Sequence, residues 1–170
     1  MKKFIHRIAT IDDIPAIEEL MELSITQLLG PLLNQDQLEA SFDSMGLDDQ
    51  LIKDQTYFMI FSDDIFIGCG GWSNRETLFG GNHTPNRDDK FLNPAIDSAR
   101  IRAMYTHPDW IRMGIGTLVM NLGEKAAKKL GVQIFEKSPV EKILVKNRRV
   151  SGVKVNGQII ECEYLVLATG

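Results

Sequence analysis

The chain has 170 residues, of which 44% are hydrophobic and 25% charged, and its formal net charge is −4. That length suits one domain with a sizeable core. The acidic balance gives no general attraction to nucleic acid. The two cysteines, Cys69 and Cys162, lie too far apart in the sequence to support a disulfide framework or a metal site. No apolar run reaches the roughly 18 residues of a membrane span and no apolar segment follows Lys2-Lys3, so we expect a cytoplasmic protein without a membrane partner.

The N-terminal segment predicts a strand followed by two helices. Phe4 to Ala9 is the strand, and Thr10 with the acidic residues after it offers caps for the first helix. Gly30-Pro31 ends that helix, and Asn34 to Met45 predicts the second. Apolar positions of the first helix keep helical spacing: Ile14, Ile17, Leu20, Met21 and Ile25.

Two apolar runs, Thr56 to Ser62 and Ile65 to Trp72, are separated by a pair of aspartates and predict a β-hairpin. The glycines of Gly68-Cys69-Gly70-Gly71 fit either a bulge or the close approach of a ligand to the backbone. The polar stretch from Ser73 to Asp97 predicts a long loop, and we expect a functional lid there rather than disorder.

The stretch Thr106 to Thr117 leads from the apolar strand Ala99 to Tyr105, through a proline turn, into a glycine-containing helix start. A helix N-terminus carries unpaired N–H groups and partial positive charge, and Gly114 and Gly116 lack the Cβ atoms that would block a diphosphate. The same spacing also fits a plain strand-to-helix turn whose glycines relieve crowding.

The helix after this turn runs from Ile115 to Leu130 and is strongly amphipathic. Gly131 ends it, and Val132 to Glu136 predicts the next strand. Its buried side is expected to hold Leu118, Val119, Leu122, Ala126 and Leu130, while Lys125, Lys128 and Lys129 stay in solvent.

These segments together resemble the GCN5-related N-acetyltransferases, the GNAT family. The family's acetyl-coenzyme A signature is Gln/Arg-x-x-Gly-x-Gly/Ala; Gly114 and Gly116 match it, Ile111 stands at the Gln/Arg position, and Arg112 supplies a charge beside it. The resemblance implies an α/β (α+β) fold, with a mixed central sheet flanked by helices and an acetyltransferase core over residues 1–136. It covers about residues 4–132 and includes Ile8-Ala9-Thr10-Ile11-Asp12-Asp13, Gly68-Cys69-Gly70-Gly71-Trp72, Arg75-Glu76-Thr77-Leu78-Phe79-Gly80-Gly81 and Leu92-Asn93-Pro94.

The resemblance implies acetyl-coenzyme A as cosubstrate and transfer of its acetyl group to a primary amine of a small molecule or a protein. Backbone groups of Ile101, Ala103 and Tyr105 are expected to hold the pantetheine arm and polarise the thioester carbonyl, and the two N-terminal helices to wall the acceptor side. The cosubstrate-binding residues are expected to be Met104, Tyr105, Thr106, Arg112, Met113, Gly114, Ile115, Gly116 and Thr117.

Such a transfer needs a base for the ammonium group of the acceptor and a proton donor for the departing thiolate. We expect Glu76, and after it Asp97, as the base, because both flank the expected acceptor cleft; for each, a solvated loop carboxylate is the alternative. Tyr105 and His107 are the candidate donors, and the alternatives are that Tyr105 packs and that His107 caps its turn.

Residues 137–170 depart from the GNAT pattern, which continues through another helix and two strands. From Pro139 to Gly170, alternating apolar and polar residues with turns at Asn147-Arg148-Arg149 and Asn156-Gly157 predict a β-meander. We expect this tail to replace or extend the usual closing strands, or to pair with a second copy in a homodimer. The segment Glu124 to Gly170 also resembles part of an FAD-dependent oxidoreductase, whose ending is matched by Ala168-Thr169-Gly170.

The sequence lacks the rest of a flavin site. A Rossmann unit needs Gly-x-Gly-x-x-Gly after a first strand and an acidic residue about 20 positions on, whereas Gly114-Ile115-Gly116 is followed by Val119 in the third glycine's place. We therefore expect no bound FAD. Two functions stay open. One is an active N-acetyltransferase; the other is a catalytically impaired acyl-coenzyme A binding module, or a chimeric or decayed acetyltransferase with a flavoprotein-like tail.

Overall fold

The computed structural model describes residues 4–77, 81–82, 89–93, 97, 99–131, 137–162 and 165. It has two compact units, Met1–Val132 and Gln133–Gly170, which are described separately below. The strand expected over 132–136, parts of the loop expected over 73–97 and the flavoprotein-like ending at 168–170 lie outside the described residues.

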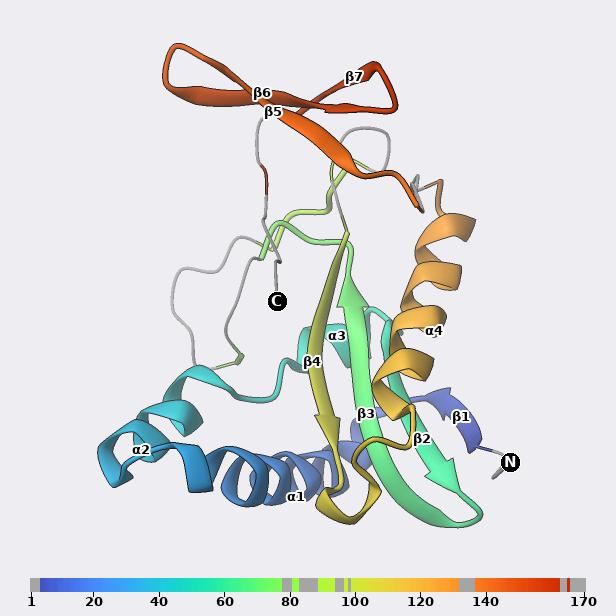
Figure 1. The fold of residues 1–170 in the computed structure, drawn as a ribbon. Coiled ribbons are helices and arrows are strands. Elements are labelled where there is room, and N and C mark those ends of the chain that lie inside the picture. Colours follow the sequence, from blue (N-terminus) through green and yellow to red (C-terminus); the bar gives the residue numbers. More distant parts are fainter. Residues whose placement is uncertain are drawn as a thin grey trace. The chain divides into compact units, whose positions relative to one another are not determined.

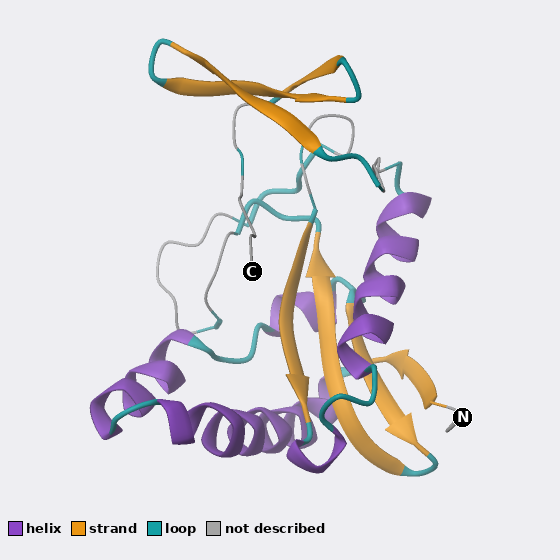
Figure 2. Ribbon diagram, in the orientation of Figure 1, coloured by secondary structure: helices purple, strands orange, loops and turns teal. Residues whose placement is uncertain are grey.

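The first unit is built on an antiparallel sheet with the strand order β1-β2-β3-β4 (Figure 1). Helices lie on both faces of this sheet, which confirms the expected α/β class (Figure 2). The strands are β1 (Phe4–Ile8), β2 (Tyr57–Ser62), β3 (Ile65–Ser73) and β4 (Arg100–Thr106).

The helices of this unit are α1 (Ile14–Ser24), α2 (Gln35–Ser44), α3 (Asp49–Lys53) and α4 (Ile115–Lys129). The expected cap at Thr10 is present, since a capping box joins Thr10 to Asp13. Asn34 forms a second capping box with Gln37 at the start of α2. A π-turn at Ile25–Leu29 and a 3₁₀ turn at Gly30–Leu32 separate α1 from α2, while Pro108–Trp110 form a 3₁₀ turn before α4. None of the helices within the described ranges is long and apolar enough to span a membrane.

Strand β2 divides the core into two layers, because successive side chains of a strand point to opposite faces. Tyr57 and Met59 pack with α1 and α3 on one face, and Phe58 and Ile60 pack with α4 on the other. Almost the whole strand is buried, so the sheet holds the two helical layers apart and positions both.

Helix α4 differs in part from its expected form. Its buried residues are Ile115, Val119, Gly123 and Ala127, whereas Leu130 is 53% exposed, since the helix ends at Lys129. Gly123 belongs to the buried stripe because a Cβ there would lie 2.6 Å from Ile101 Cδ1. The helix therefore packs closely against β4, and of the expected stripe Val119 is buried while Leu118, Leu122 and Ala126 are partly buried beside it.

The second unit is the expected meander. Strands β5 (Val140–Lys146), β6 (Arg149–Val155) and β7 (Gln158–Glu161) form a three-stranded antiparallel sheet. Asn147 and Arg148 turn the chain with positive φ, and Asn156 and Gly157 do the same, as two-residue hairpin turns require. The strand order of this sheet is β5-β6-β7.

Candidate active site

Strand β4 carries an extra residue opposite Gly70. Cys69 pairs with Tyr105 and Gly71 pairs with Arg102. One residue therefore separates the paired positions on β3, whereas two residues separate them on β4. Ala103 has φ +51° at this point, a left-handed conformation that few non-glycine residues adopt. The bulge predicted near these glycines therefore exists, but the inserted residue belongs to the partner strand.

The bulge changes which side chains of β4 face each helical layer. Ile101 packs with α4 before it, and Met104 approaches the same layer after it; Arg102 and Tyr105 lie on the opposite face. Gly70 has room only for a hydrogen atom here, since a Cβ would lie 2.8 Å from Val119 Cγ1 and 2.9 Å from Met104 Cγ. Close packing explains this glycine.

The turn after β4 directs the chain into α4. The His107 amide N–H donates to the Ile67 carbonyl, and His107 Nδ1 accepts from the Asp109 amide N–H at 3.2 Å. His107 thus caps its own turn, which is the alternative given for it above. Gly114 is the N-cap of α4, with φ +86°.

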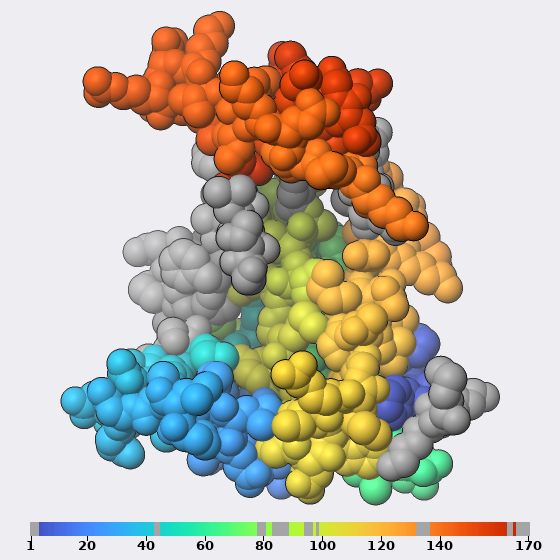
Figure 3. All heavy atoms as spheres, viewed as in Figure 1, coloured from blue at the N-terminus to red at the C-terminus, as the bar shows by residue number. Residues whose placement is uncertain are grey.

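The start of α4 is open around its two glycines. A Cβ on Gly114 would meet no protein atom within 4 Å, and one on Gly116 would meet only Met104 Cε at 3.6 Å. The first N–H groups of the helix have no partner within the helix itself. We call Arg112 to Thr117 the cradle; it adjoins the exposed Met104 and carries the positive side chain of Arg112. In Figure 3 the yellow surface, formed by the end of β4 and the turn before α4, lies beside the blue surface of the N-terminal helical segment.

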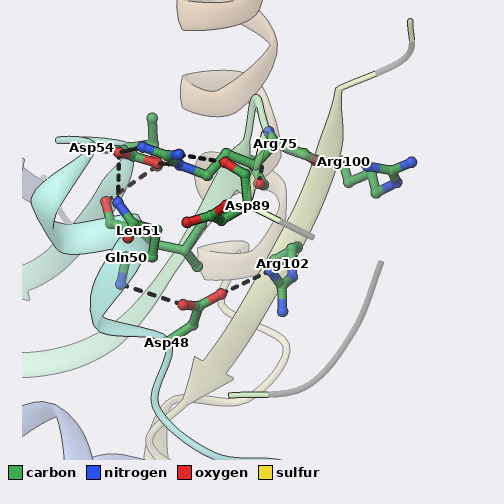
Figure 4. A network of polar contacts seen from close by, with 10 residues as sticks. Asp48, Gln50, Leu51, Asp54, Arg75, Asp89, Arg100 and Arg102 are labelled. Atoms are coloured by element: carbon green, nitrogen blue, oxygen red, sulfur yellow. Dashed lines mark hydrogen bonds and ion pairs between the residues drawn. The ribbon is translucent and has the colours of Figure 1, made fainter. Parts of the chain in front are cut away.

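Two ion pairs tie the opposite face of the sheet to α3 (Figure 4). Asp48 and Arg102 approach to 2.7 Å with side chains 1% and 8% exposed. Arg75 contacts Asp54 through two nitrogens, at 2.5 and 2.7 Å, and donates to the Asp89 carbonyl. These contacts anchor both β4 and the first residues of the long loop.

The expected base residues lie in that loop. Glu76 is exposed, and its amide N–H donates to the Lys90 carbonyl. The Asp97 carboxylate accepts from the Asn93 amide N–H at 2.6 Å, so it closes a local turn. Within the described ranges, His, Cys, Asp and Glu side chains form no group of three that could hold a metal ion.

Tyr105 lies in the core with α1 and is 7% exposed. Burial raises the pKa of its hydroxyl to about 12, and the neighbouring Cys69 adds to the shift. The ring packs in the core, and a hydroxyl with this pKa keeps its proton at neutral pH.

The sequence did not predict helix α3, nor the contacts of Asp48 and Tyr57 with β4 on the face of the sheet that packs against α3. Asp48 caps α3 by accepting from the Gln50 amide N–H; an aspartate pair before Leu51 is the signal that predicts such a start. Tyr57 gave a weaker signal: a tyrosine in an otherwise apolar strand needs a partner for its hydroxyl. Its partner, the Ala103 carbonyl, is 46 residues away.

The family model of the GNAT acetyltransferases matches residues 17–141. Because that match spans most of the sequence, the chain belongs to the GNAT acetyltransferase family. The match includes β4, the cradle and α4 and ends at the start of β5.

Two solved structures share the fold. The PaiA N-acetyltransferase from Thermoplasma acidophilum, in complex with coenzyme A, has a TM-score of 0.51 and 13% identity over 95% of this chain and 99% of its own. A GCN5-related N-acetyltransferase from Rhodopseudomonas palustris has a TM-score of 0.51 and 16% identity over 94% of this chain and 92% of its own. No curated protein sequence matches the chain.

Proposed function

We propose that the protein is an acetyl-coenzyme A-dependent N-acetyltransferase that transfers the acetyl group to a primary amine of a small molecule or a protein. The observation that carries this proposal is the open cradle at Gly114, placed by a bulged strand within a chain of the GNAT family. The coenzyme A held by the Thermoplasma protein of the same fold supports the choice of cosubstrate.

The residues of the cradle fit a diphosphate. The absence of side chains at Gly114 and Gly116 leaves the helix N–H groups accessible, and the partial positive charge of the helix N-terminus attracts the anion. Arg112 adds a full charge from the position next to Ile111, where the family has Gln or Arg. Along β4, we assign backbone groups of Ile101, Ala103 and Tyr105 to the pantetheine arm and the thioester carbonyl, except the Ala103 carbonyl, which accepts from Tyr57.

The acceptor side carries negative charge, which supports an amine. Between Ile8 and Ile52 the sequence contains no lysine, arginine or histidine, while acidic residues recur throughout. Several of them are exposed on α1 and α2: Glu18, Glu19, Glu22, Asp36 and Glu39. A face with one sign of charge raises the local concentration of ligands with the opposite sign, so ammonium-bearing acceptors are favoured at these helices.

Proton transfer is assigned to groups outside the cradle. Glu76 is the better candidate for the base because its carboxylate is exposed, whereas the Asp97 carboxylate holds the Asn93 amide N–H. Tyr105 keeps its proton near neutral pH and is the candidate donor to the thiolate, although its raised pKa makes it a weak acid.

The competing function is a binding module that holds acyl-coenzyme A without turnover. It is favoured by one observation: the family match ends at residue 141, and the described tail strands form a sheet of their own. A thiol-release assay with acetyl-coenzyme A and a panel of mono-, di- and polyamines separates the two functions. Amine-dependent release supports the transferase, and saturable coenzyme A binding without release supports the module. We also expect the purified protein to carry no FAD. A yellow protein that keeps its flavin absorbance through gel filtration would contradict that expectation.

A further inference from the structure

Tyr57 begins β2 and is 1% exposed, yet its hydroxyl reaches the irregular part of β4. The Tyr57 Oη lies 2.8 Å from the Ala103 carbonyl oxygen. Ala103 is the bulge residue, with φ +51°. The buried Tyr57 hydroxyl therefore contacts the β4 peptide at the bulge, where the regular hydrogen-bond pattern between β3 and β4 is interrupted.

Cys69 links the same hydroxyl to the other side of the bulge. Its Sγ lies 3.3 Å from Tyr57 Oη, and Cys69 is the strand partner of Tyr105. Because a carbonyl can only accept, the Tyr57 proton goes to Ala103, and the thiol hydrogen is left for Tyr57 Oη. Tyr57 and Cys69 thus hold the residues before and after Met104.

These contacts determine where the Met104 amide points. In a trans peptide the C=O and N–H bonds point in opposite directions. The Ala103 carbonyl points inward to Tyr57, so the N–H of the same peptide, which belongs to Met104, points away from that face. Met104 is 38% exposed, and its side chain lies next to Gly116 in the cradle.

We propose that Tyr57 is a positioning residue for acetyl transfer: through the Ala103 carbonyl, its hydroxyl sets the direction of the Met104 amide N–H beside the cradle. The proposal rests on the proposed function and adds a buried residue that does not itself touch either substrate. Burial raises the pKa of the Tyr57 hydroxyl well above its usual value, so the hydroxyl remains a donor throughout the working pH range.

The test compares Tyr57→Phe with Thr56→Val. Tyr57→Phe keeps the ring and removes only the hydroxyl. Thr56→Val removes the neighbouring buried hydroxyl, which donates to the Leu51 carbonyl of α3 at 3.1 Å rather than to a group of β4. Each variant is assayed for kcat with acetyl-coenzyme A, for coenzyme A affinity by calorimetry, and for backbone amide NMR shifts.

Tyr57→Phe should lower kcat at least about tenfold, because a misplacement of about 1 Å caused by a mutation away from the chemistry can cost about 100-fold. Its coenzyme A affinity should stay within about twofold of the wild type, since the cradle groups are unchanged. Thr56→Val should keep kcat within about twofold, as expected when only a remote hydrogen bond is lost. The amide shifts in Tyr57→Phe should change at Ala103, Met104 and Tyr105.

An unchanged kcat in Tyr57→Phe overturns the proposal, and so does an equal loss in both variants, which marks a purely structural role. If the wild type transfers acetyl to no amine, the proposed function fails and the amide shifts decide about Tyr57. Shifts confined to the bulge then support its positioning role, whereas unchanged shifts at Met104 overturn it.

Discussion

Gly114 and Gly131 lie just before and just after α4, with φ +86° and +92°. A Cβ at either position meets no protein atom within 4 Å. Because a residue with a side chain disfavours positive φ, substitution of either glycine costs the same kind of backbone strain, on the order of 1–2 kcal/mol. Only Gly114 lies in the cradle. They provide a matched pair for testing the diphosphate site.

Gly114→Glu should abolish coenzyme A binding, because the new side chain fills the diphosphate space and repels its charge. Gly131→Glu should lose comparable stability and retain binding. Calorimetry with coenzyme A measures the affinity, and thermal unfolding verifies that both variants are folded. Unchanged affinity in a folded Gly114→Glu protein would show that coenzyme A binds elsewhere.

At the scale of elements, Arg75 connects the long loop to α3. Its guanidinium pairs with Asp54 between side chains only 14% and 9% exposed, and its backbone forms a bridge with Phe91. Burial opposes ionisation of Asp54, but hydrogen bonds from Arg75 and Gln50 outweigh burial and lower the pKa of this carboxyl. The loop is thereby fixed at its base, next to the strand that leads to the cradle.

The lowered pKa of Asp54 predicts how stability depends on pH. The unfolded chain binds a proton at Asp54 near pH 4 and the folded chain does so at lower pH, so the contribution is complete above about pH 5 and is lost as the pH falls. Urea unfolding between pH 7 and pH 3 should therefore give a falling free energy of unfolding.

Asp54→Asn should be less stable at neutral pH and show a weaker decline on acidification. The pair Asp49–Lys53, with side chains 29% and 53% exposed, offers a control, since an i,i+4 helix pair contributes only about 0.3–0.5 kcal/mol. Asp49→Asn should therefore keep the wild-type slope. An Asp54→Asn protein with that same slope would show that other groups cause the acid sensitivity.

At the scale of the whole molecule, both units expose apolar side chains at strands. In the described sheet of the first unit, β4 is an edge strand and Met104 is 38% exposed. In the second unit, Val140, Val145 and Ile159 are 53%, 64% and 62% exposed. Strand edges with apolar neighbours are prone to aggregation unless they are covered.

Truncation after Glu136 should therefore leave the core insoluble or unfolded, whereas truncation after Cys162, which retains β5–β7, should not. Solubility and gel filtration compare the two chains, and coenzyme A binding reports on the cradle. A soluble, monomeric chain of residues 1–136 that binds acetyl-coenzyme A would show that the tail is dispensable and does not replace closing strands.

Much of the fold was predictable because local signals agree with it. The caps at Thr10 and Asn34, the hairpin of β2 and β3, and the glycine that starts α4 each act within a few residues. Prediction failed where packing decided: Leu130 lies past the helix end, and the buried stripe of α4 includes Gly123 because Ile101 needs that space.

For the site, the sequence by itself determined the cradle, since Gly114 and Gly116 at a helix start are local features of the chain. Only the tertiary structure decided the rest. The bulge at Ala103 arises from a register shift between two strands, and the contacts of Tyr57 and Asp48 with β4 join residues 46 and 54 positions apart. Such contacts leave no periodic pattern in the sequence, because they depend on how the sheet and α3 pack together.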